Sequence, residues 1–106
     1  MHNDAPAPPE ACSSMTELRE AIDTLDRQLV GLLARRQRYV ERAAILKQNR
    51  TAVRDEGRVE EVIAKVIAEG RKAGLSPDIA GAVWRSLIDA SIVHEFSAFD
   101  GKSSAN

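Results

Sequence analysis

The sequence predicts an all-α protein with three helices per chain, one long and two shorter. Apolar residues recur at steps of three and four over most of the chain, which is the spacing of one face of an α-helix. The alternation that is typical of strands is nearly absent, and aromatic residues make up only 4% of the sequence. A chain of 106 residues is long enough for one domain with a modest core.

The expected domain spans residues 14–99, between two polar ends. Residues 1–13 are rich in Pro and Ala and lack periodicity, so we expect a disordered leader, and we expect residues 100–106 to be a disordered tail. Ser14, followed three residues later by Glu17, is a capping-box pattern. It predicts a first helix from Met15 to about Asn49, on the order of 50 Å long.

The first helix carries charges on its apolar stripe. The stripe consists of Leu18, Ile22, Leu25, Leu29, Leu32, Val40 and Ala43. The same count passes through Arg36 and, beyond Ala43, reaches Lys47, so both cations point in the direction that a helix normally keeps for its core. Because charges on a core stripe are costly unless they are neutralised, the pair predicts an anion bound between helices.

Two shorter helices follow a connector at residues 50–55. Asp55 is a candidate N-cap for the second helix, whose stripe includes Val59 and Val62, and Gly74 supplies its stop. Ser76 and Pro77 predict the start of a third helix that ends near Phe99. One of its two apolar faces carries Trp84, Ile88, Ser91 and Glu95, so we expect Ser91 and Glu95 to face an interior or a pocket.

Three helices of such unequal length make a poor monomer. The two shorter helices, roughly 30 Å each, cannot cover both ends of the first. We therefore expect an intertwined helical homodimer, in which the long helices pair and each chain completes a site of the other.

The composition argues against several classes of binding partner. The formal charge of −1 argues against nucleic acid or an anionic membrane surface, and no apolar run is long enough to span a bilayer. No signal peptide is recognisable, so we expect a cytoplasmic protein. Cys12 has no second cysteine to pair with, and neither a metal site nor a cofactor motif is present.

The residue types favour binding of a small di-anion. Several cations, Arg19, Arg36, Lys47 and Arg58, accompany the polar residues Asp55, Ser91 and Glu95 on apolar helices. Surface roles remain open: Arg19 can pair with Asp23, Arg58 can pair with Asp55, Lys47 can project into water, and Glu95 can be a surface acid. The residues alone give no reaction.

Four segments together resemble the all-helical (AroQ) class of chorismate mutases. They are L-R-E-x-I-D-x-L-D-x-x-L-V-x-L-L-A-x-R at 18–36, Lys47, V-R-D-x-x-R at 53–58, and L-I-D-x-S-I-V-x-E at 87–95. The resemblance covers residues 15–97 and implies an intertwined dimer of three-helix chains. It also implies a Claisen rearrangement of chorismate to prephenate, without a cofactor or a covalent intermediate.

The resemblance also implies roles for the candidate residues. Arg19 would reach one substrate carboxylate across the dimer, and Arg36 would bind the other. Lys47 would contact the ether oxygen and a carboxylate, where fixed donors stabilise the negative charge that builds as the C–O bond breaks. Arg58 would reinforce the anion site, with Asp55 and Ser91 as further polar positions. Apolar walls would come from Ala43, Val62 and Ile88.

Two positions depart from the usual family pattern. Val59 stands where a glutamate often binds the ring hydroxyl, and isochorismate-pyruvate lyases, which share the fold, look similar at this Arg-Val pair. Glu95 stands where many members have a glutamine that donates to the ether oxygen. A glutamate donates there only when it is protonated, which predicts activity that falls as the pH rises.

Three alternatives to a chorismate mutase remain at this stage. Val59 favours an isochorismate-pyruvate lyase, whereas Asp55 and Ser91 favour the mutase. A mutase acting on an amino analogue of chorismate fits the same residues. A non-catalytic helical dimer module would keep the fold without activity, but the cations on the inner stripe speak against it, because a scaffold gains nothing from burying them.

Overall fold

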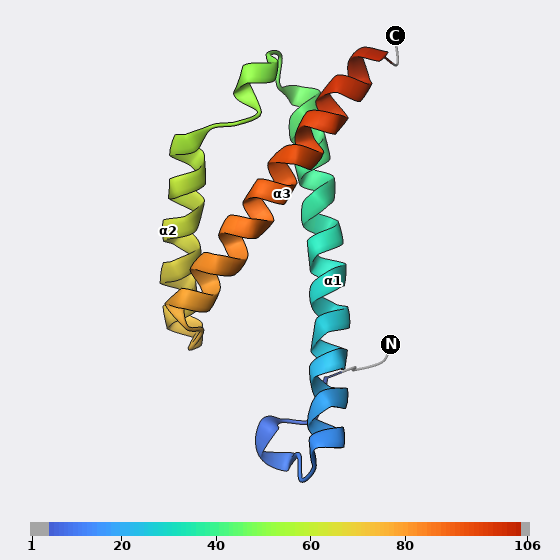
Figure 1. The fold of residues 1–106 in the computed structure, drawn as a ribbon, viewed down its shortest axis with the longest axis vertical. Helices are drawn as coiled ribbons and strands as arrows, with labels where there is room; N and C mark the ends of the chain where they lie inside the picture. The colour runs from blue at the N-terminus through green and yellow to red at the C-terminus, as the bar shows by residue number, and fades with distance from the viewer. Residues whose placement is uncertain (1–4, 105–106) are drawn as a thin grey trace. The chain divides into compact units, whose positions relative to one another are not determined.

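A computed structural model describes residues 5–104, and these residues form helices and loops with no strand among them. Three α-helices, α1 (Met15–Leu46), α2 (Glu56–Ala73) and α3 (Pro77–Ser104), follow one another along the chain (Figure 1). Two short 3₁₀ helices, η1 (Pro9–Ala11) and η2 (Arg50–Ala52), precede and follow α1. The all-α fold with three helices is therefore confirmed. The predicted length of roughly 30 Å fits α2, with 18 residues, but not α3, which has 28 residues against 32 in α1. Within residues 5–104, no helix is both long and apolar enough to cross a membrane.

The chain divides into two units, Met1–Arg38 and Tyr39–Asn106, and α1 runs through the boundary. The first unit begins α1 with a side-chain cap: Ser14 Oγ accepts from the Glu17 backbone N–H at 3.1 Å. The Glu17 carboxylate accepts from the backbone N–H of Ser13, at 2.9 Å, one residue before the position that a capping box requires. Half of the predicted box is thus present, and the start of α1 at Met15 is confirmed.

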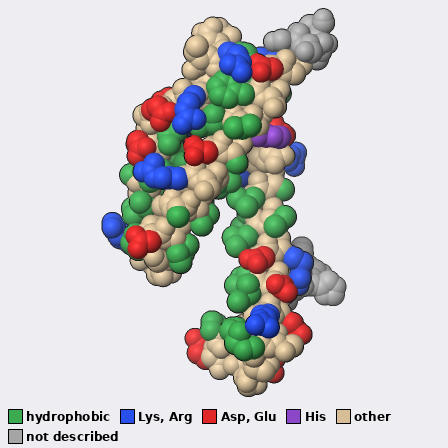
Figure 2. Space-filling view, viewed as in Figure 1, with side chains coloured by type: hydrophobic (Ala, Val, Ile, Leu, Met, Phe, Trp, Pro, Cys, Tyr) green, Lys and Arg blue, Asp and Glu red, His purple; other side chains and the backbone are tan. Residues whose placement is uncertain are grey.

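The apolar stripe of the first unit lies on its surface. No side chain among residues 5–38 is buried, and Leu29 and Leu32 are 54% and 56% exposed. Figure 2 shows apolar side chains along this part of α1. The same stripe includes Leu18, Ile22 and Leu25. The pattern that normally marks a core face is therefore left open to solvent in the single chain.

The second unit contains the core, which α2 and α3 form by lying side by side (Figure 1). Buried Val53, which directly follows η2, meets Ile63 of α2 and Ile88 and Ile92 of α3. Partly buried apolar residues surround this cluster: Val59, Val62, Ile67, Trp84, Phe96 and Phe99. One apolar face of α3 therefore packs as predicted, whereas Ile79 and Val83 of its other face are exposed.

The predicted helix signals set the bounds of α2 and the start of α3. Asp55 Oδ1 accepts from the Arg58 backbone N–H at 3.0 Å and caps α2. Gly74 ends α2 with a φ of 82°, a conformation that favours glycine. Ser76 Oγ accepts from the Ile79 backbone N–H at 3.4 Å, and Pro77 occupies the first position of α3.

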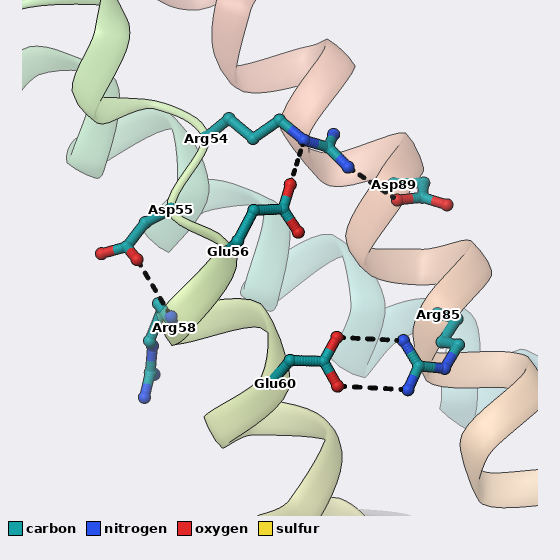
Figure 3. A network of polar contacts seen from close by, with 7 residues as sticks. All are labelled: Arg54, Asp55, Glu56, Arg58, Glu60, Arg85 and Asp89. Carbon is teal, nitrogen blue, oxygen red and sulfur yellow. Dashed lines mark hydrogen bonds and ion pairs between the residues drawn. The ribbon is translucent and has the colours of Figure 1, made fainter.

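Ion pairs join α2 to α3 on their outer surface (Figure 3). The Arg85 guanidinium donates to both oxygens of Glu60 at 3.3 Å. Arg54 contacts Glu56 at 2.5 Å and Asp89 of α3 at 3.9 Å. All of these side chains are about half exposed or more, so each pair contributes little on its own but helps to fix how the two helices align.

Two predicted helix ends are wrong. The first helix stops at Leu46 rather than near Asn49, and the chain turns into η2. The third helix continues to Ser104 rather than ending near Phe99, so residues 100–104 are helical and not a disordered tail. Contacts with distant residues explain the extension: Asp100 accepts from Arg50 at 3.0 Å, and Lys102 donates to backbone carbonyls at the end of α1.

The structure describes only part of the predicted leader and of the predicted tail. Residues 1–4 of the predicted leader and residues 105–106 of the predicted tail lie outside the described residues. Residues 9–11, which also belong to that leader, form η1. Disorder of the remaining leader stays a prediction.

Candidate active site

Lys47 and Glu95 form the central contact of the candidate site. Lys47 Nζ donates to Glu95 Oε2 at 2.7 Å, a charge-assisted hydrogen bond between residues 48 positions apart. Lys47 directly follows the last turn of α1, and Glu95 lies in the middle of α3. Glu95 is only 7% exposed, which confirms the prediction that it faces an interior. The geometry pairs an acid from one apolar helix with a cation from another.

The pair leaves donors for a ligand. An ammonium group has three N–H donors and no acceptor, and one of the three is used by Glu95. The Lys47 side chain is 30% exposed, so an oxygen-rich anion can approach it from solvent. An incoming anion can therefore accept from the two N–H donors that Glu95 does not use.

Ile88, Val59 and Val62, which are among the residues predicted to form an apolar wall, pack in or against the core of the second unit. Ile88 is buried in the core cluster two turns before Glu95, and Val59 and Val62 pack against that cluster from α2. Ser91, one turn before Glu95, is half-buried and has an interaction of its own. Ala43 is half-buried in the last turn of α1, one turn before Lys47, and its carbonyl accepts from the Lys47 backbone N–H at 3.0 Å.

Asp55 and Arg58 serve the start and the outer surface of α2. The Asp55 side chain is the N-cap of the helix. The Arg58 guanidinium pairs with Glu61, one turn further along α2, and is 60% exposed. The hydrogen bond from Arg58, with one from Lys65, lowers the pKa of the exposed Glu61 carboxyl. The structure thus gives both residues local roles and does not bring them to the pair of Lys47 and Glu95.

Arg19 and Arg36 belong to the first unit. Arg19 is exposed on the first turns of α1. Arg36 is half-buried and is engaged by a neighbouring group. Their predicted roles as anion ligands therefore remain predictions.

Two residues near the pair did not enter the predicted site. His94 Nε2 lies 2.6 Å from Glu41 Oε2 and links α3 to α1, which agrees with a structural role for this histidine. Lys102 donates to three carbonyls at the end of α1, among them that of Lys47. Sequence analysis assigned Lys102 to a polar tail and missed this contact, because no local pattern indicates a contact between residues 55 positions apart.

A separate pocket of about 370 Å³ lies towards the other end of α2 and α3. Its lining consists of Lys65, Val66, Glu69, Gly70, Ala73, Leu75 and Trp84. None of the predicted site residues lines it, and its walls are mostly apolar, so it is a poor place for a di-anion. Among residues 5–104, no cluster of three or more His, Cys, Asp or Glu side chains has the arrangement of a metal site.

Comparison with known proteins shows similarity to a protein family and to a curated relative. Residues 18–96 match the sequence profile of the family described as chorismate mutase type II. Over 80 residues the chain is 31% identical to a protein of Pseudomonas aeruginosa named isochorismate pyruvate lyase, and the alignment covers 76% of this chain and 79% of that protein.

Proposed function

We propose that this protein, which belongs to the chorismate mutase type II family, rearranges chorismate to prephenate. Family membership and the similarity to a lyase support an enzyme of the isomerase or lyase class. The proposed reaction moves electrons within one substrate molecule: the ether C–O bond breaks while a C–C bond forms. Such a reaction needs a fixed substrate shape and a stabilised oxygen rather than a nucleophile.

The hydrogen bond between Lys47 and Glu95 is the observation that carries this proposal. It presents an ammonium donor beside a buried carboxyl group, next to the apolar wall formed around Ile88. In the proposed complex, Lys47 donates to the ether oxygen as negative charge builds there. Glu95, which accepts from Lys47 at 2.7 Å, would hold the ammonium in place beside this oxygen.

We further propose that the active enzyme is a homodimer with shared sites. The exposed apolar stripe on the first unit supports this, because a face containing Leu29 and Leu32 is stabilised when a second copy covers it. In this arrangement Arg36 binds one substrate carboxylate, and Arg19 of the partner subunit binds the other. Arg58 would leave Glu61 to strengthen the same anion site.

Isochorismate pyruvate lyase is the second candidate function. Val59, which directly follows Arg58, packs against the apolar core, so it offers no polar contact to a ring hydroxyl. The 31% identity to a protein with that name points the same way. Both reactions begin from a di-anionic cyclohexadiene with an enolpyruvyl ether, and the same ammonium would assist either.

Parallel incubations with chorismate and isochorismate separate the two functions. Loss of chorismate absorbance and formation of prephenate support the mutase, whereas salicylate fluorescence with release of pyruvate supports the lyase. The proposal predicts that chorismate is the better substrate by kcat/KM. Faster turnover of isochorismate would replace the first function by the second, and absence of turnover with both would leave a non-catalytic module.

A further inference from the structure

The ammonium of Lys102, a residue of α3, binds the C-terminal end of α1. Its ammonium donates to the carbonyl oxygens of Ala44 at 2.7 Å, Ile45 at 3.2 Å and Lys47 at 2.6 Å. An ammonium group has three N–H donors, so this contact uses all of them. The ring of Phe99 lies against the same ammonium, with 4.2 Å between Nζ and the ring centroid. Lys102 is thereby fixed in one place, although it lies near the end of the chain.

The end of α1 needs an external donor. The last carbonyls of a helix have no partner within the helix and carry partial negative charge. The last turn of α1 contains no basic residue, and within residues 5–104 the left-handed conformation that often caps a helix occurs only at Gly74. Lys47 directly follows Leu46, but its ammonium donates to Glu95, so the cation that binds the carbonyls at the helix end is Lys102 of α3.

Two residues on one face of α3 bind Lys47, one at its backbone carbonyl and one at its side-chain ammonium. Its backbone carbonyl binds Lys102, and its side-chain ammonium binds Glu95. Glu95 and Lys102 are seven residues apart, which places them two turns apart on the same side of the helix, with Phe99 between them. The position of the Lys47 ammonium therefore depends on where Lys102 fixes the start of that side chain.

We propose that Lys102 is a positioning residue for Lys47, an inference that rests on the proposed function of the site. Lys102 acts through the backbone and touches no substrate. Without its ammonium, the carbonyls at the end of α1 turn to water and the last turn loosens. Lys47 then reaches the reacting oxygen in fewer molecules, and a misplacement of about 1 Å can cost up to 100-fold in rate.

Arg50 provides a matched control from the same region. It donates to Asp100 at 3.0 Å and lies over the ring of Phe96, so it also ties the end of α3 to the segment after α1. Both members of this ion pair are more than half exposed, and their hydrogen bonds join two side chains rather than a side chain and a helix carbonyl. Removing Arg50 weakens the same junction without releasing the carbonyls that Lys102 holds.

Steady-state kinetics of Lys102→Met and Arg50→Met test the proposal with whichever of the two substrates the unaltered protein turns over. We expect Lys102→Met to lower kcat by roughly 10- to 100-fold with a much smaller change in KM. Arg50→Met should stay close to the unaltered protein. An unchanged kcat in Lys102→Met, or an equal loss in both variants, would overturn the positioning role.

Chemical rescue distinguishes the lost ammonium from a general loss of structure. In a Cys12→Ser background, the thiol introduced by Lys102→Cys displaces bromide from 2-bromoethylamine and gives a side chain with the length and charge of lysine. We expect this treatment to restore most of the lost kcat. Failure to restore it after complete modification would contradict the proposal.

Amide hydrogen exchange separates this inference from the proposed function. In Lys102→Met, residues 45–49 should exchange faster while the core of α2 keeps its rate, whether or not the protein turns over either substrate. Unchanged exchange at residues 45–49 would overturn the inference. Absence of turnover in the unaltered protein would count against the proposed function alone.

Discussion

The hydrogen bond between Lys47 and Glu95 determines what an anionic substrate meets on arrival. In the free chain the Lys47 ammonium donates to the buried Glu95 carboxylate at 2.7 Å, so one of its three N–H donors is already used before binding. A di-anion that reaches the site meets the two N–H donors of Lys47 that Glu95 does not use. In the proposed mechanism one of these donors stabilises the ether oxygen as the C–O bond breaks.

Gly74 shows how one residue determines a helix end. Its φ of 82° costs an alanine roughly 1 kcal/mol, so Gly74→Ala should lower the free energy of unfolding by about that amount. Gly31→Ala is the matched control, because Gly31 lies inside α1 with open space around it and a helix interior favours alanine. Urea unfolding measures both. Equal losses of stability would contradict the account of Gly74.

The ion pair between Glu60 and Arg85 gives the α2 and α3 packing a pH dependence. The hydrogen bond from Arg85, with its charge, lowers the pKa of Glu60 below its ordinary value of 4.5. A lowered pKa adds stability above the ordinary value, and this stability is lost as the pH falls through the folded-state value.

Glu60→Gln should therefore lower the urea midpoint at pH 7, and its difference from the unaltered protein should vanish as the pH falls to about 2. Glu69→Gln is a suitable control, because Glu69 pairs with Lys72 on its own helix. A difference that persists unchanged in acid would show that Glu60 does not act through its charge.

The elements differ in how far their bounds could be predicted. Asp55, Gly74, Ser76 and Pro77 act within a few residues of themselves, so local patterns were sufficient for α2 and the start of α3. The end of α3 was missed, because Asp100 and Lys102 bind residues at least 50 positions away. The same holds for the site. Helical spacing predicted a buried Glu95 but gave no indication that Lys47 is its partner. The contact of Arg58 with Glu61 was not predicted either.

At the scale of the whole molecule, the exposed stripe of α1 is the feature that a single chain leaves unexplained. Leu29 is 54% exposed, and a polar substitution at an isolated surface leucine usually changes stability by no more than about 0.5 kcal/mol. In the proposed dimer the same position is covered by a second chain, where an unpaired charge is costly.

Leu29→Asp should therefore convert a dimer into monomers, which sedimentation equilibrium measures directly. Arg38→Asp is the control, because Arg38 is exposed on the opposite side of the same helix. An unchanged mass for Leu29→Asp, or a monomeric unaltered protein, would contradict the proposed assembly.

The most direct test of the proposed enzyme is kcat/KM for chorismate, measured for the unaltered protein and for Lys47→Gln. A glutamine keeps a donor for Glu95 but removes the positive charge, so helical circular dichroism should be unchanged. We expect the unaltered protein to form prephenate and the variant to lose on the order of 100- to 1000-fold, as when a donor to a developing oxyanion is removed. Equal rates in the two folded proteins would contradict the central role of Lys47.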